Sequence, residues 1–180
     1  MDKEYETQIL DIDKVSIAKM LRGLGAKEEP EVLQKRWVFD IEPCTTKSTG
    51  EWLRLRQVAD RKPTITYKNK SGKGISDTTK IEIEVSDFDT AYKLLDKIMP
   101  TTQFYQENKR HKFVLDDVEY TLDTWPMIPT IMEIEAKSEE KVHKALELLG
   151  LTGKDEGHIG TLAIYEKYGI ALHSMKELKF

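Results

Sequence analysis

Acidic residues recur in this sequence in pairs that are separated by a single residue. Three Glu-x-Glu pairs stand in segments with alternating apolar residues, at Glu4 and Glu6, Glu82 and Glu84, and Glu133 and Glu135. Residues two apart in an extended strand point to the same face, so each pair would set two carboxylates side by side, where like charges repel. Clustered carboxylate oxygens favour hard divalent cations such as Mg²⁺ or Mn²⁺. The pairs therefore favour a metal site.

Basic residues follow the same spacing. Arg54 and Arg56 form one pair, and Arg110 and Lys112 form another. Guanidinium and ammonium groups favour phosphate oxygens as partners. A site that contains both the carboxylates and these cations would bind a polyphosphate or a nucleotide together with a divalent metal.

The elements that must position these residues can be read from the apolar pattern. Alternation with a period of two predicts eight strands, at about residues 4–9, 34–41, 52–56, 64–68, 80–85, 106–115, 118–123 and 132–136. Helical spacing predicts three helices, which follow the cap residues Asp13, Asp87 and Ser138, and a weaker fourth helix at about 159–168.

These elements can be assembled in two ways. An antiparallel sheet with one face in water also alternates, but a solvated face should mix charges of both signs, whereas here like charges stand together. We therefore expect an α+β fold, in which a closed eight-stranded antiparallel β-barrel has a polar lumen. The amphipathic helices would flank the barrel and cover its apolar outer face.

The composition excludes several other classes of protein. The chain has 180 residues, with 28 Lys and Arg against 32 Asp and Glu, so its bulk charge does not attract nucleic acid. We expect one domain over residues 1–180, with a core at about 1–168 and a C-terminal tail at 169–180. The single Cys44 allows no disulfide within the chain and fits a reducing compartment. Because no signal peptide or membrane span is recognisable, we expect a cytoplasmic protein that binds no membrane.

The ordered set of motifs resembles the CYTH superfamily, the triphosphate tunnel metalloenzymes, which includes class IV adenylyl cyclases and thiamine triphosphatases. The N-terminal Glu-x-Glu-x-Lys signature of that family reads EYETQ here, starting at Glu4. WLRLR carries its Arg-x-Arg, ITYK supplies the tunnel lysine Lys68, and KIEIE matches its central acidic pair. The closing basic strand, Asp and Glu-x-Glu follow as Arg110, Asp123, Glu133 and Glu135. The similarity extends from Glu4 to about Tyr168.

The resemblance implies a role for each of these residues. The metal ligands would be Glu4, Glu6, Asp123, Glu133 and Glu135, and the four glutamates among them would also be catalytic. The phosphates would be bound by Arg54, Arg56, Lys68 and Arg110. Glu82 and Glu84 would hold those cations in place. The implied cofactor is Mg²⁺ or Mn²⁺, the implied ligand is a small triphosphate or nucleotide, and a homodimer is compatible with the family.

Two positions depart from the family pattern. Gln8 stands where the first lysine is expected, and Asn108 stands where the basic strand often has another lysine. The leading hypothesis is a metal-dependent hydrolase of inorganic or organic triphosphates. A class IV adenylyl cyclase, which makes cyclic AMP from ATP, is the second hypothesis. A non-catalytic protein that binds polyphosphate or nucleotide is the third, because each departure removes a positive charge.

Other residues with chemical potential are expected to lie at the surface. Arg36 is expected to form a surface ion pair. The four histidines, His111, His143, His158 and His173, lack the spacing of metal ligands, and we expect them to be surface groups.

Overall fold

The computed structural model describes residues 2–41, 50–70, 75, 78–99 and 103–180. Cys44 lies outside the described residues. The elements follow in the order β1 (Asp2–Ile9), α1 (Lys14–Gly23), β2 (Lys27–Glu28), β3 (Val32–Asp40), β4 (Glu51–Val58), β5 (Thr64–Lys70), β6 (Thr78–Glu84), α2 (Phe88–Ile98), β7 (Gln103–Leu115), β8 (Val118–Thr124), β9 (Ile131–Ala136), α3 (Glu139–Leu148), α4 (Thr161–Lys167), a 3₁₀ turn at Leu172–Ser174, and β10 (Glu177–Leu178). All eight predicted strands and four predicted helices are confirmed. The two-residue strands β2 and β10, which are too short to show a periodicity, were not predicted.

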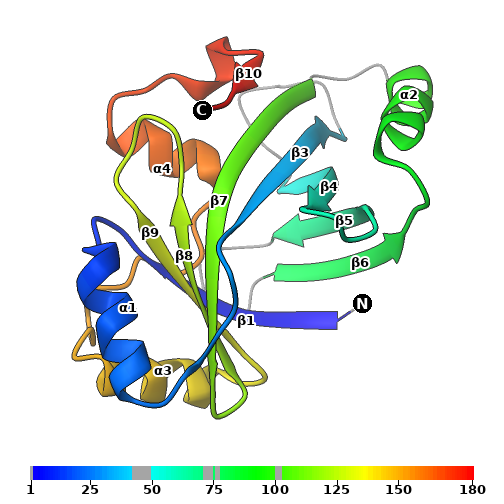
Figure 1. Cartoon of the computed structure of the whole chain (residues 1–180). Helices are drawn as coiled ribbons and strands as arrows, with labels where there is room; N and C mark the ends of the chain where they lie inside the picture. Colours follow the sequence, from blue (N-terminus) through cyan, green and yellow to red (C-terminus); the bar gives the residue numbers. More distant parts are fainter. Residues whose placement is uncertain (1, 42–49, 71–74, 76–77, 100–102) are drawn as a thin grey trace.

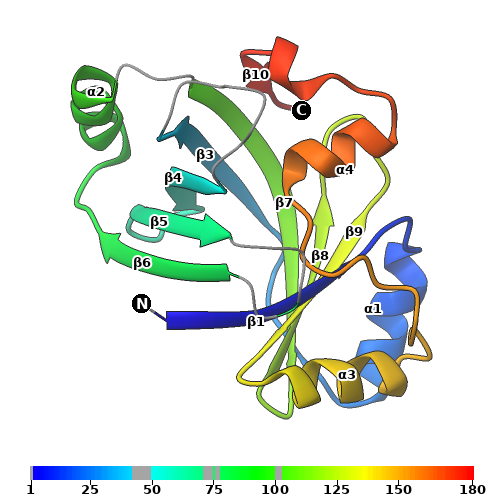
Figure 2. The same ribbon diagram turned by 180° about the vertical axis from the view of Figure 1, so that it is seen from behind.

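The sheet is strongly curled, and its strands follow one another through a continuous series of pairings. The eight longer strands are neighbours in the order β7, β3, β4, β5, β6, β1, β9 and β8, and β7 also pairs with β8. Two strands change partner along their length. Residues 2–4 of β1 pair with β6 and residues 5–9 with β9, whereas β7 pairs with β3 through residues 103–110 and with β8 through residues 109–115. The result is a curled, half-open barrel (Figures 1 and 2). The antiparallel eight-stranded sheet is confirmed, and its closure into a complete tube stays a prediction.

The helices begin at the caps that the sequence predicts. The carboxylate of Asp13 accepts hydrogen bonds from the backbone N–H groups of Val15 and Ser16, and Asp87 accepts one from Thr90. The hydroxyl of Ser138 likewise accepts the N–H of Lys141. Such caps satisfy donors that the first helical turn leaves without a partner. No helix in the described part of the chain is long and apolar enough to cross a membrane.

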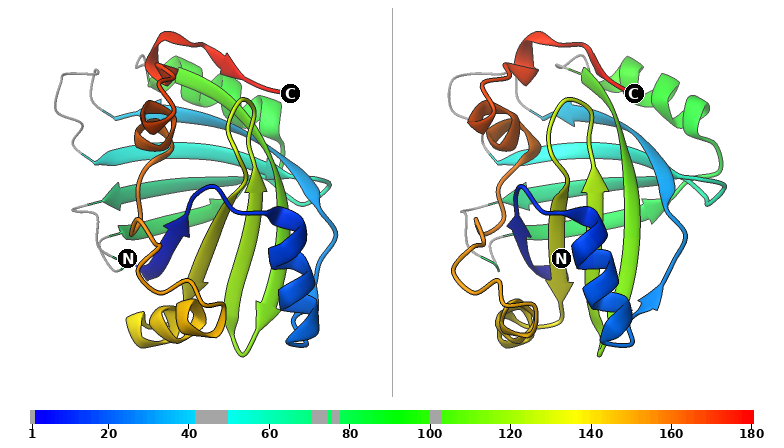
Figure 3. Two further views of the ribbon diagram at one scale, coloured as in Figure 1. Left: turned by 90° about the vertical axis from the view of Figure 1, so that its left-hand side faces the viewer. Right: turned by 60° about the vertical axis from the view of Figure 1, so that its left-hand side comes forward.

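The helices cover the apolar face of the sheet. α1 and α3 pack on one end of it, where β7, β8, β9 and β1 contribute Phe113, Tyr120, Leu122, Met132, Ile134 and Ile9 to a buried cluster. α2 covers a second cluster that contains Phe39 and Leu55. α4 and the C-terminal residues form a third cluster at the opposite end from α1 and α3 (Figure 3). Because these contacts use the apolar side of the covered strands, the polar side is left to line the concave interior. Ile81 and Ile83 of β6 remain exposed.

The strand register brings the functional residues to that interior. Directly opposite residues of antiparallel strands share a face, and Glu6 lies opposite Glu135 and Gln8 opposite Glu133. Arg110 lies opposite Asp123. The register therefore places one set of predicted site residues on one face, namely Glu6, Arg110, Asp123, Glu133 and Glu135.

Candidate metal and polyphosphate site

Three carboxylates from two neighbouring strands form a group that could hold a metal ion. Glu6 on β1 and Glu133 and Glu135 on β9 each offer an oxygen, and these oxygens all lie within 4.8 Å of one another. Glu6 is buried, so water does not screen the repulsion between its carboxylate and the carboxylates of Glu133 and Glu135. A hard divalent cation fits this donor set, since it takes carboxylate oxygens and would neutralise the repulsion between them. These three are among the five metal ligands that the resemblance implies.

The surroundings of Glu133 hold it in its ionised form. The amide of Gln8 donates a hydrogen bond of 3.2 Å to one of its oxygens, and Arg110 donates one of 3.2 Å to the other. Burial opposes ionisation, but Arg110, His158 and Lys68 outweigh it and hold the pKa of Glu133 below its ordinary value. An ionised carboxylate is the form that a metal requires.

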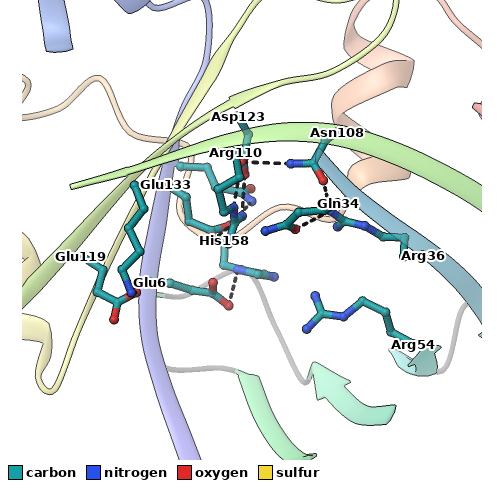
Figure 4. A network of polar contacts seen from close by, with 12 residues as sticks. Glu6, Gln34, Arg36, Arg54, Asn108, Arg110, Glu119, Asp123, Glu133 and His158 are labelled. Carbon is teal, nitrogen blue, oxygen red and sulfur yellow. Dashed lines mark hydrogen bonds and ion pairs between the residues drawn. The ribbon is translucent and has the colours of Figure 1, made fainter. Parts of the chain in front are cut away.

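Asp123 and Arg110 are bound to each other rather than held apart. Asp123 accepts a hydrogen bond of 2.8 Å from Nε of Arg110 and one of 3.0 Å from the amide of Asn108 (Figure 4). Burial works against the charge on Arg110, but Asp123 and Glu133 raise its pKa on balance. The structure thus joins one predicted metal ligand to one predicted phosphate ligand, and Asp123 positions Arg110 beside Glu133.

Arg54 and Arg56 form the cationic wall on β4. Their guanidinium nitrogens lie 3.9 Å and 3.7 Å from the same oxygen of Glu82, which also accepts a 2.6 Å hydrogen bond from Thr66. The charge of Arg54, together with burial, lowers the pKa of Arg56 to about 9. A bound anion would offset the repulsion between the two guanidiniums.

The remaining predicted residues lie in different surroundings. The amino group of Lys68 lies 3.9 Å from Glu6 in the buried interior, which links β5 to the carboxylate group. Glu84 is exposed and lies 3.7 Å from the exposed Lys62, so the structure does not bring it to Arg54 and Arg56. The backbone of Glu4 pairs opposite Thr78 on β6. Lys112 lies 2.8 Å from Glu119.

His158 corrects one prediction from the sequence. It was expected at the surface, but it is buried, and its Nδ1 lies 2.6 Å from Oε1 of Glu6. The contact sets the imidazole directly against the carboxylate of Glu6. His158 stands in the segment between α3 and α4, where no periodicity in the sequence could indicate its direction. His143, by contrast, is exposed as expected.

Arg36 corrects a second prediction. It was expected in a surface ion pair, but it is 6% exposed and lies on the interior face of β3. Its guanidinium donates to Oε1 of Gln34 at 2.9 Å and to Oδ1 of Asn108, and it lies 4.8 Å from the centre of the Trp125 ring. The sequence contains a signal for this placement. Alternate residues of a strand face the same side, so Arg36 lies on the side of Gln34 and opposite to the side of the core residue Phe39.

Comparison with known families agrees with this geometry. The CYTH domain model matches residues 2–157. This chain belongs to the CYTH family. The match contains all eight main strands and every residue of the site except His158, which follows it directly.

Solved structures show the same CYTH fold. The PH1012 protein of Pyrococcus horikoshii has 22% sequence identity and a TM-score of 0.72, with 87% of this chain and 96% of that chain covered. A candidate adenylate cyclase of Vibrio parahaemolyticus has 15% identity and a TM-score of 0.74, with 92% and 98% covered. HpAC1 of Hippeastrum, described as a candidate adenylyl cyclase with a dominant triphosphatase activity, has 16% identity and a TM-score of 0.62, with 93% and 96% covered. No curated protein sequence matches this chain.

Proposed function

We propose that this CYTH protein is a divalent-metal-dependent hydrolase of inorganic or organic triphosphates. The observation that carries the proposal is the pairing of two opposite chemistries in one interior. Three carboxylates lie within 4.8 Å of one another, and Lys68 reaches the same Glu6 from the strand next to Arg54 and Arg56. A polyphosphate with its metal ion is the kind of ligand that would satisfy both sets at once.

The residues divide the work of such a reaction between them. Arg54 and Arg56 would hold phosphoryl oxygens and fix the orientation of the polyphosphate. Arg110, fixed by Asp123 and Glu133, would present a guanidinium at the junction with the carboxylates. Glu6, Glu133 and Glu135 would hold Mg²⁺ or Mn²⁺, which when bound supplies positive charge to the phosphoryl oxygens. The triphosphatase activity described for HpAC1 supports hydrolysis as the reaction.

A phosphate-release screen tests the proposal. Inorganic triphosphate, ATP and thiamine triphosphate are each incubated with the protein and Mg²⁺ or Mn²⁺, and cyclic AMP is measured in the ATP reactions. We expect metal-dependent phosphate release from at least one substrate. The matched controls are Glu133→Gln, which removes a proposed metal ligand and should abolish release, and Glu139→Gln, which changes an exposed glutamate of α3 and should not.

The other outcomes separate the alternatives. Cyclic AMP without free phosphate would replace the hydrolase with a class IV adenylyl cyclase, whose nucleophile is a ribose oxygen instead of water. No product from any substrate, with triphosphate still bound in a calorimeter, would leave a binding protein. Release that is equally fast in Glu133→Gln would mean that the assignment of the metal ligands is wrong.

A further inference from the structure

We propose that Arg36 adds a third guanidinium to the cationic wall of Arg54 and Arg56 and binds a phosphoryl group of the polyphosphate directly. The inference rests on the proposed function and adds to it a residue outside the motifs that identified the site. Three observations carry it: the place of Arg36 in the sheet, the chemistry of its partners, and its relation to Asn108.

The sheet places Arg36 next to the cations that are proposed to bind phosphate. Arg36 on β3 lies directly opposite Arg56 on β4 and opposite Gln106 on β7, and opposite residues share a face. Figure 4 shows Arg36 and Arg54 extending into the same interior. The ring of Trp125 packs against the guanidinium at 4.8 Å, so the group is held in one orientation and need not be ordered on binding.

The partners of Arg36 are neutral. It donates to the amide oxygens of Gln34 and Asn108. Within the described part of the chain, no carboxylate oxygen lies within 4.0 Å of its guanidinium, and its buried Nε has no hydrogen-bond acceptor there. Burial above all, and then the charges of Arg54 and Arg56, lower its pKa. A buried cation in such surroundings costs free energy that an anion would recover.

Arg36 also compensates for the positive charge that is missing at Asn108. The register sets Gln34 opposite Asn108, so the side chain of Arg36 reaches Asn108 from the neighbouring strand. Asn108 in turn donates to Asp123, which holds Arg110. The positive charge that β7 lacks at this level is therefore supplied by β3, and a chain of hydrogen bonds connects it to the carboxylate side.

Calorimetric titration with inorganic tripolyphosphate, without metal, tests the inference independently of turnover. Arg36→Gln removes the charge, and Arg36→Lys keeps it but loses the planar fork. We expect Arg36→Gln to bind tripolyphosphate about 10- to 100-fold more weakly, the range of one charge-assisted hydrogen bond, with Arg36→Lys in between. Arg61→Gln is the control, since Arg61 is an exposed arginine paired with Glu29, and its affinity should equal that of the wild type.

A thermal melt of the ligand-free proteins separates binding from structure. Because the buried charge has neutral partners, Arg36→Gln should melt at or above the wild-type temperature while it binds less. A melting temperature far below that of the wild type would make Arg36 a structural residue and overturn the inference. Unchanged affinity in both Arg36 variants, while Arg56→Ala loses binding, would also overturn it but leave the proposed function. Unchanged affinity in Arg56→Ala as well would overturn both.

Discussion

Nδ1 of His158 lies 2.6 Å from Oε1 of Glu6, although the two residues are far apart in the sequence and both are buried. β1 itself holds the segment that carries His158. The backbone of Gln8 bonds to Glu156 and Gly157, and its side-chain oxygen accepts the N–H of Ile159 at 3.1 Å. The strand that carries the proposed metal ligand Glu6 thus also holds the segment that places His158 against it.

His158 is a positioning residue, and its removal should weaken the metal site. We expect His158→Ala to lower Mn²⁺ affinity by about 10- to 100-fold, as is typical when the partner of a metal ligand is lost. His158→Asn offers an N–H near the place of Nδ1 and should recover most of that affinity. Calorimetric titration with Mn²⁺ measures both. Equal losses in the two variants would mean that His158 fills space and does not orient Glu6.

Replacing Gln8 by the lysine of the family pattern should not raise the activity. Its amide donates to Glu133 and accepts from Ile159, and a lysine can donate but cannot accept. We expect Gln8→Lys to lower metal-supported turnover and to loosen the segment at 156–159, with faster amide exchange at Ile159. A rise in turnover with exchange unchanged would show instead that the site lacks a charge at this position.

Glu133 gives the protein a specific dependence on acid. Its folded pKa lies below the ordinary value of 4.5, so its ionised form contributes stability that is present above about pH 4.5 and is lost as the pH falls below it. Glu133→Gln lacks this contribution. Urea unfolding of both proteins should therefore show a stability difference that narrows between about pH 5 and about pH 3. A constant difference over that range would contradict the assignment.

Arg56 should matter for binding more than for folding. It contributes a partly satisfied charge to the interior, at 3.7 Å from Glu82, and its lowered pKa reports repulsion from Arg54 and burial. We expect Arg56→Ala to bind tripolyphosphate about 10- to 100-fold more weakly, while its urea midpoint stays near that of the wild type. Leu146→Ala, in the core between α3 and the sheet, should do the reverse and cost about 2–5 kcal/mol of stability without loss of affinity.

The sequence predicts most of the fold because period-two alternation is strong in every long strand. The same alternation assigns Glu6, Arg110, Asp123 and Glu133 to one face, so the centre of the site is also predictable. It fails for His158, whose contact with Glu6 depends on a path between α3 and α4 that no local pattern encodes. The alternation also indicates the face on which Arg36 lies. A charged residue in a strand is usually solvated, however, and only the contacts of Arg36 with Trp125 and Asn108 show that it is buried.

The change of partners in β1 and β7 has a mechanical consequence. β1 passes from β6 to β9 between Glu4 and Tyr5, and β7 passes from β3 to β8 at Lys109 and Arg110. These two changes of partner divide the sheet into a part that carries Arg36, Arg54 and Arg56 and a part that carries Glu6, Glu133 and Glu135. A ligand that contacts both parts would hold them together. Part of its binding free energy would then stabilise the curled sheet that encloses it.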